Sequence, residues 1–149
     1  DGHSAARLHK RLVLEEGIAH SVSVSYDGLR RGPGVFYVAF TPVKDRELRD
    51  LEAVWLDEAL KLVTHGVSED ELNRVKAQVI AGQVFSSDSV LGQASRMGRM
   101  WAIGFAPNAS DVINEKLRVI TPDQVRQVAE KYLVEHQATI AILEPKTSK

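Results

Sequence analysis

The chain has 149 residues, of which 44% are hydrophobic, and its 19 Lys and Arg residues almost balance its 20 Asp and Glu residues. This length corresponds to one domain with a core, and the formal net charge of −1 argues against a nucleic-acid-binding protein, which would carry a basic excess. No apolar run approaches the roughly 20 residues of a membrane-spanning helix, and the lack of cysteine excludes disulfides, thiol catalysis and cysteine-ligated metals.

The N-terminal third of the chain predicts a helix followed by a β-hairpin. Residues 4–16 have helical spacing, with Leu8 and Leu12 on one face, and Gly17 is well placed to end this helix. The residues that follow alternate between serine and apolar side chains, as in a half-buried strand. The expected hairpin consists of a strand over residues 21–26, a glycine-rich loop over 27–34 and a more central strand over 35–41.

The rest of the chain predicts four helices and one more strand. Ser68 and Glu71 match a capping box, in which each side chain bonds to the backbone amide of the other residue. The helix that they open is expected to bury Leu72, Val75 and Val79. Residues 121–124 predict a second cap, with Thr121 as the capping residue and Pro122 at the first helical position. The expected elements are helices over about residues 45–65, 68–85, 86–104 and 121–133, and a strand over residues 138–143.

The order of these elements predicts an α+β fold, with an antiparallel-rich sheet and helices packed on one face. Three strands form a thin sheet for so many helices. The chain also begins with Asp1-Gly2-His3-Ser4, without an initiating Met or a signal peptide. We therefore expect residues 1–149 to form a single domain that is an incomplete part of a longer chain.

Motifs for catalysis and metal binding are sparse. The five histidines form no H-E-x-x-H pair, and residues 132–136 match the inverted zinc motif H-x-x-E-H only with Tyr132 in place of the first histidine. We interpret this near-match as a coincidence, because tyrosine is a poor zinc ligand beside a neutral imidazole. Arg30 and Arg31 in the glycine-rich loop suggest anion binding, although a solvated loop tip is the simpler interpretation. Phosphate-loop, dinucleotide and serine-hydrolase motifs do not occur.

Three segments carry patterns that occur together in one protein family. They are R-L-H-K-R-L-V with E-G-I-A-H-S-V-S in residues 7–23, G-V-S-E-D-E-L-N-R-V-K in residues 66–76, and I-T-P-D-Q-V with A-E-K-Y-L in residues 120–133. In this order they resemble the C-terminal, non-zinc half of the insulinase/pitrilysin-type zinc metallopeptidases, the inverzincin family. The resemblance extends over nearly the whole chain.

The resemblance implies two similar α+β halves, in one chain or two subunits, that close around a peptide. The N-terminal half would hold zinc on H-x-x-E-H and a distant Glu, so this chain would hold no metal and no catalytic residue. It would be a truncated pitrilysin- or mitochondrial-processing-peptidase-like half-domain that encloses the substrate during peptide-bond hydrolysis. Its partners would be the zinc-bearing half and a peptide, and an open sheet edge would favour self-association. The resemblance leaves the bacterial periplasm and the cytoplasm open as compartments.

The same resemblance points to two substrate-binding positions. The family's second half often supplies an Arg and a Tyr, seven residues apart, that reach the substrate near the zinc. Val13 and His20 stand at these positions, so both residues are changed. His20 could still donate a hydrogen bond to a peptide carbonyl or an oxyanion, whereas Val13 could not, and a histidine without a role is an equal alternative. The two changes favour an alternative function, a catalytically inactive homologue that acts as a structural or protein-binding subunit.

Overall fold

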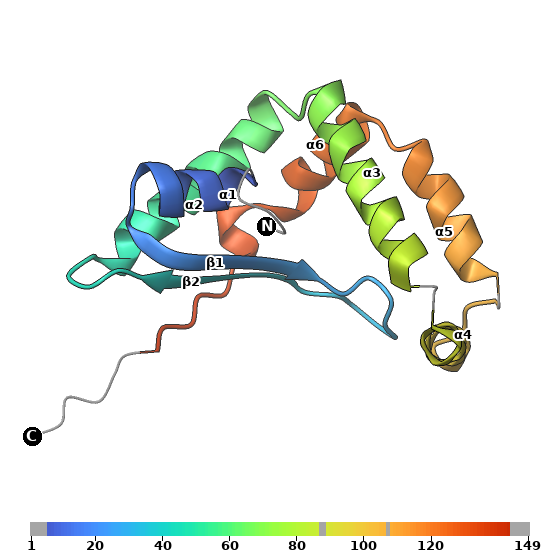
Figure 1. The fold of residues 1–149 in the computed structure, drawn as a ribbon. Coiled ribbons are helices and arrows are strands. Elements are labelled where there is room, and N and C mark those ends of the chain that lie inside the picture. Colours follow the sequence, from blue (N-terminus) through green and yellow to red (C-terminus); the bar gives the residue numbers. More distant parts are fainter. Residues whose placement is uncertain (1–5, 87–88, 107, 144–149) are drawn as a thin grey trace, which may run out of the picture.

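The fold of the chain is α+β, as the sequence predicts, with a two-stranded antiparallel sheet and six α-helices among the described residues. The structure is a computed structural model, and it describes residues 6–86, 89–106 and 108–143. Figure 1 shows the hairpin of β1 and β2 beneath α1 and α2, with α3, α4 and α5 beyond one end of the strands. The elements are α1 (Arg7–His9), the π-helical η1 (Lys10–Glu15), β1 (Ala19–Tyr26), β2 (Phe36–Pro42), α2 (Leu48–Thr64), α3 (Glu69–Ser86), α4 (Val90–Ala102), α5 (Ala109–Arg118), α6 (Pro122–Tyr132) and the 3-10 helix η2 (Glu135–Gln137).

The hairpin has one apolar face and one small, polar face. Val22 lies opposite Phe40 and Val24 opposite Val38, and these four side chains belong to the packed face. The serines between the β1 valines are exposed, as their alternation in the sequence predicts. The helices therefore cover a single face of the sheet.

The hydrophobic core lies between this apolar face and the helices α1, η1 and α2. Leu12 in η1 and Leu51 in α2 are its most deeply buried large side chains, with 0% and 1% of their surfaces exposed. Phe36 of β2 stacks on Trp55 of α2 with the ring centroids 6.0 Å apart. The buried cluster consists of Leu8, Leu12, Ile18, Ala19, Val22, Leu51 and Val54.

The helix α6 packs beside α2 and so connects the C-terminal part of the chain to the helices over the hairpin. The helix α3 packs beside α5. Lys76 of α3 donates hydrogen bonds to the carbonyl oxygens of Arg118 and Ile120, at 3.0 and 2.6 Å, and so fastens the end of α5. None of the helices in the described part of the chain combines the length and the hydropathy that a membrane-spanning helix requires.

Two predictions about strands are wrong. Residues 138–143 form no strand, and Ile140 and Ile142 are exposed, because within the described residues β1 and β2 pair only with each other. An alternating sequence becomes a strand only where a neighbouring backbone supplies the ladder of hydrogen bonds. The segment predicted as a more central strand, β2, is for the same reason one of two edge strands, and 43% of the Phe36 surface is exposed.

The predicted helices need three corrections. The sequence analysis predicts no element between residues 104 and 121, where the structure has the helix α5. In α3, Leu72 is buried as expected, but Val75 and Val79 are exposed. The helix α4 begins at Val90 rather than at about residue 86, and Ser89 caps it, because the Ser89 hydroxyl accepts a hydrogen bond from the amide of Gly92.

The two predicted capping sites have different outcomes. Thr121 and Gln124 form a complete capping box with Pro122 in the first turn of α6, so this prediction is confirmed. At α3, Ser68 accepts a hydrogen bond from the amide of Glu71 at 3.2 Å, but the carboxylate of Glu71 pairs with a distant arginine. The capping box at Ser68 is therefore only half formed.

The backbone of Gly17 lies in the left-handed region, which favours glycine over residues with a side chain. Its φ is +59°, and an added Cβ would meet nothing within 4 Å, so Gly17→Ala would cost backbone strain alone, about 1 kcal/mol of the free energy of unfolding. Gly82→Ala, in the interior of α3 and equally uncrowded, should instead stabilise by about 0.5–1 kcal/mol. Urea unfolding measures both changes, and effects of the same sign would contradict this explanation.

Candidate functional site

The junction between η1 and β1 carries both substrate-binding positions taken from the family resemblance. The amide of Glu16 bonds to the carbonyl of Arg11, five residues back, at 2.8 Å, which is the widened turn of a π-helix. Such turns are frequent at functional sites. Gly17 then reverses the chain in the left-handed region, and the amide of Ile18 closes the turn on the carbonyl of Leu12 at 3.0 Å.

His20 lies at a β-bulge directly after this junction. Ala19 is opposite Pro42 and Ser21 is opposite Thr41, so two steps along β1 match one step along β2. Pro42 has no amide hydrogen with which to continue the ladder, which is a physical reason for an irregularity at this point. The side chain of His20 is exposed. Bulges often re-aim a side chain next to an active site, and this one holds an imidazole at the surface.

Val13 has a different environment. Its side chain is half-buried and packs against the core cluster. The structure therefore places one of the two candidate residues in the packing of η1 and leaves the other at the surface. Of the pair, only His20 offers a polar group to solvent.

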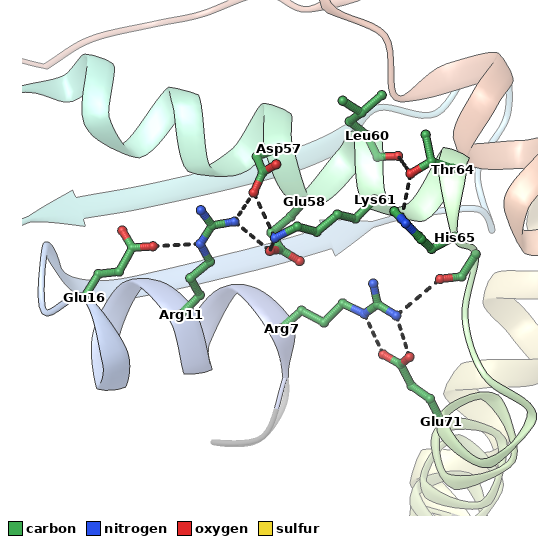
Figure 2. A network of polar contacts seen from close by, with 11 residues as sticks. Arg7, Arg11, Glu16, Asp57, Glu58, Leu60, Lys61, Thr64, His65 and Glu71 are labelled. Carbon is green, nitrogen blue, oxygen red and sulfur yellow. Dashed lines mark hydrogen bonds and ion pairs between the residues drawn. The ribbon is translucent and has the colours of Figure 1, made fainter.

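A network of charged side chains fastens η1 to α2, as Figure 2 shows. Arg11 donates to the carboxylates of Glu16 at 2.7 Å and Glu58 at 2.8 Å, and also to Asp57. Lys61 pairs with Asp57 and Glu58, both at 2.9 Å. Only 9% of the surface of Glu58 is exposed, so this carboxylate is buried between two cations.

These contacts favour the charged forms of Arg11, Asp57, Glu58 and Lys61. Hydrogen bonds from Lys61 and Arg11 lower the pKa of Asp57. Burial raises the pKa of Glu58, but the bonds from Lys61 and Arg11 outweigh burial, so the net shift is downward. Hydrogen bonds to Glu16, Asp57 and Glu58 raise the pKa of Arg11. A general acid or base needs a pKa near the working pH. The pKa shifts of Arg11, Asp57 and Glu58 all lead away from neutral pH, so we assign the network a structural role, that of holding η1 against α2.

A second ion pair connects α1 to the start of α3. Arg7 donates through Nε and Nη2 to the two carboxylate oxygens of Glu71, at 2.8 and 2.6 Å, and its Nη2 also reaches the carbonyl of Gly66 at 3.4 Å. The hydrogen bond from Arg7 lowers the pKa of Glu71. Nothing in the spacing of these residues, 64 positions apart, indicates the pair (Figure 2).

The histidines and carboxylates do not converge on a metal site. Among the described residues, no group of three or more His, Asp and Glu side chains is placed to hold a metal ion. His65 bonds to its neighbour Thr64 at 2.8 Å, and His136 is exposed in η2. The described residues therefore do not fit a zinc ion.

Comparisons with known proteins show that this chain is similar to zinc proteases. A family model described as the peptidase M16 inactive domain matches residues 2–79, which include the whole η1–β1 junction. An uncharacterized zinc protease of Streptomyces coelicolor is 25% identical over 132 residues, which are 89% of this chain. The chain spans only 28% of the length of that relative.

Two solved structures have the same fold. The inactive peptidase domain of a proposed zinc protease from Bordetella parapertussis superposes with a TM-score of 0.80 at 17% identity, covering 97% of this chain and 78% of that one. A proposed zinc protease from Bordetella pertussis superposes with a TM-score of 0.76 at 16% identity, covering 91% and 72%. At sequence identities of 16% and 17%, the similarity to these two structures shows a shared fold.

Proposed function

We propose that this chain, which belongs to the peptidase M16 inactive-domain family, forms one wall of a peptide-binding chamber in a zinc protease. The observation that carries the proposal is the family match over more than half of the chain, including the junction that holds His20. The zinc would be held by an N-terminal half, in the same longer chain or in a partner subunit. Residues 1–149 would then be most of the second half.

His20 is the residue that we propose to touch the substrate. A neutral imidazole carries one N–H, which can donate to a peptide carbonyl or to the oxyanion that forms when water attacks it. The exposed position of His20 at the bulge leaves that donor accessible. Val13 would add an apolar contact at most, because its side chain packs against the core.

The test is His20→Ala in the complete protease. We expect kcat/KM for peptide cleavage to fall at least tenfold, the cost of about one donor that stabilises the transition state. Restoring the family residue with His20→Tyr should recover most of the activity, because tyrosine also donates. The zinc content should stay unchanged, because the metal would be held by the other half.

His65→Ala is the matched control, since His65 is an exposed histidine at the far end of α2. It should leave kcat/KM within about twofold of the wild-type value. The proposal for His20 would be rejected if both alanine variants cleaved peptides like the wild type.

A second candidate function is a structural or protein-binding subunit without a role in cleavage. Two observations favour it: both family positions are changed, and Val13 has become part of the packing. The parent gene discriminates between the two functions. An H-x-x-E-H motif with a distant Glu, upstream or in the adjacent reading frame, supports the protease, and its absence supports the subunit.

A further inference from the structure

The turn that connects η1 to β1 is held by two contacts that both involve Arg11. The carbonyl oxygen of Arg11 accepts the amide of Glu16 at 2.8 Å, and its Nε donates to the carboxylate of Glu16 at 2.7 Å. The backbone and the side chain of Arg11 therefore both hold the residue that directly precedes Gly17. Figure 2 shows the side-chain contact, which crosses the last turn of the π-helix.

These contacts matter because of the glycine that follows them. Glycine adopts left-handed and right-handed backbone conformations with similar ease, so Gly17, at φ +59°, does not by itself fix the direction in which the chain leaves the turn. That direction depends on what holds the residues on either side. After Gly17, the side chain of Ile18 is buried and its amide bonds to the carbonyl of Leu12. Before Gly17, Glu16 is exposed and is held by its contacts with Arg11.

The guanidinium of Arg11 also connects the turn to α2. Its Nη1 donates to the carboxylates of Asp57 and Glu58. In Figure 2, Arg11 lies between Glu16 on one side and Asp57 and Glu58 on the other. Arginine suits this position, because its planar group donates to several acceptors in fixed directions. The turn is thereby held relative to two elements that form the core, η1 and α2.

His20 follows Glu16 by four residues. Between them, Ile18 and Ala19 are buried, with 6% and 3% of their surfaces exposed, so a displacement of the turn is passed on through packed residues to His20. The side chain of His20 is itself exposed, so the backbone of the junction has to place the imidazole. Close placement is needed, because an error of about 1 Å in a group that acts on a transition state can cost on the order of a hundredfold in rate.

We propose that Arg11 and Glu16 are positioning residues for His20, because their ion pair fixes the η1–β1 junction in the geometry that presents the imidazole to the substrate. The inference rests on the proposed function, since it needs His20 to touch the peptide. It gives the charged network, which holds η1 against α2, a second effect that reaches the site. Neither Arg11 nor Glu16 would touch the substrate.

The test is a double-mutant cycle in the complete protease, with Glu16→Ala and His20→Ala made alone and together. Glu16 is truncated because it is exposed, whereas Arg11→Ala would also remove a partner of the buried Glu58. In the presence of His20, Glu16→Ala should lower kcat/KM about fivefold, with an equal fall in kcat, because the imidazole would act on the transition state. In the His20→Ala background, the same truncation should change kcat/KM by less than about twofold.

Two further variants separate positioning from a general effect on the fold. Glu16→Gln keeps a side-chain oxygen that can accept from Nε of Arg11, so its kcat/KM should lie within about twofold of the wild-type value. Glu15→Ala is the matched control, because this neighbouring carboxylate makes only an exposed 3.4 Å pair with Lys10. It should change kcat/KM by less than about twofold in both backgrounds. Rates are compared per folded molecule, with the folded fraction taken from circular dichroism at the assay temperature.

Equal losses from Glu16→Ala with and without His20 would overturn the inference, because the effect would not pass through the imidazole. Full activity of Glu16→Ala together with low activity of His20→Ala would also overturn it, and would leave the chamber proposal intact. If His20→Ala itself kept full activity, the role of His20 would be rejected, and the positioning role with it.

Discussion

Leu12→Ala is expected to lower the free energy of unfolding by about 3 kcal/mol, a large part of the stability of a domain of this size. Leu12 is completely buried where η1 meets the sheet and α2. Its truncation would leave a cavity between elements that are held together by this cluster. Urea unfolding followed by circular dichroism measures the change, with equal denaturant slopes indicating that the unfolded state is unaffected.

Leu14→Ala is the matched control for this prediction. Leu14 lies two positions further along η1, and 59% of its surface is exposed. The same chemical change should cost no more than about 0.5 kcal/mol there. A similar loss in both variants would mean that helix propensity in η1, rather than burial, determines the effect.

Arg11→Ala is expected to destabilise the chain by about 2 kcal/mol at neutral pH. It removes one of the two cations that face the buried carboxylate of Glu58 and leaves Lys61 as its remaining ion-pair partner. Breaking a buried pair costs more than the pair contributes, because one charge stays buried without full compensation. Lys10→Ala, which removes an exposed 3.4 Å pair with Glu15, should cost less than about 0.5 kcal/mol.

The same network predicts the acid dependence of stability. The pKa values of Asp57 and Glu58 are lowered on folding, so their contribution is complete above the ordinary values of 3.8 and 4.5 and is lost as pH falls through the lower native values. In Arg11→Ala the downward shift on Glu58 shrinks while its burial persists. The variant should therefore lose less stability between pH 6 and pH 3 than the wild type, as unfolding curves over this range measure. If the free energy of unfolding fell equally with pH in the wild type and in Arg11→Ala, the role assigned to Arg11 would be refuted.

Much of the fold could be predicted because its signals are local. Gly17 ends a helix and Thr121 begins one through contacts within a few residues, and both are found as expected. The alternation of serine with valine in β1 determines which face is buried without information from elsewhere in the chain. The protein family was also predicted correctly, from three segments whose order along the chain carried more information than any one of them.

The errors arise where long-range contacts determine the outcome. Glu71 has the right spacing for a capping box, but a bidentate pair with Arg7 takes its carboxylate. Residues 138–143 alternate like a strand, but alternation does not provide a neighbour. Val75 and Val79 have core spacing on a helix that buries little of that face.

The candidate site was predicted only in part. The positions Val13 and His20 came from the family resemblance, and their roles stay predictions. The bulge that exposes His20 depends on Pro42 across the sheet, which no pattern within β1 indicates. The sequence suggests anion binding at Arg30 and Arg31 in the loop, but the structure shows that Arg31 donates a hydrogen bond to the carbonyl oxygen of Ala102 in α4, a contact that the spacing of these residues does not indicate.

The uneven distribution of buried side chains has a consequence for local unfolding. The seven residues of the core cluster belong to the region from α1 to α2, whereas α4 and α5 each bury a single side chain among those described, Met100 and Ala109. Opening α4 and α5 should thus cost much less free energy than opening the hairpin, so their amide hydrogens would exchange with solvent first. The hydrogen bond from Arg31 to the carbonyl oxygen of Ala102 joins the two regions, so it would break when α4 opens away from the hairpin.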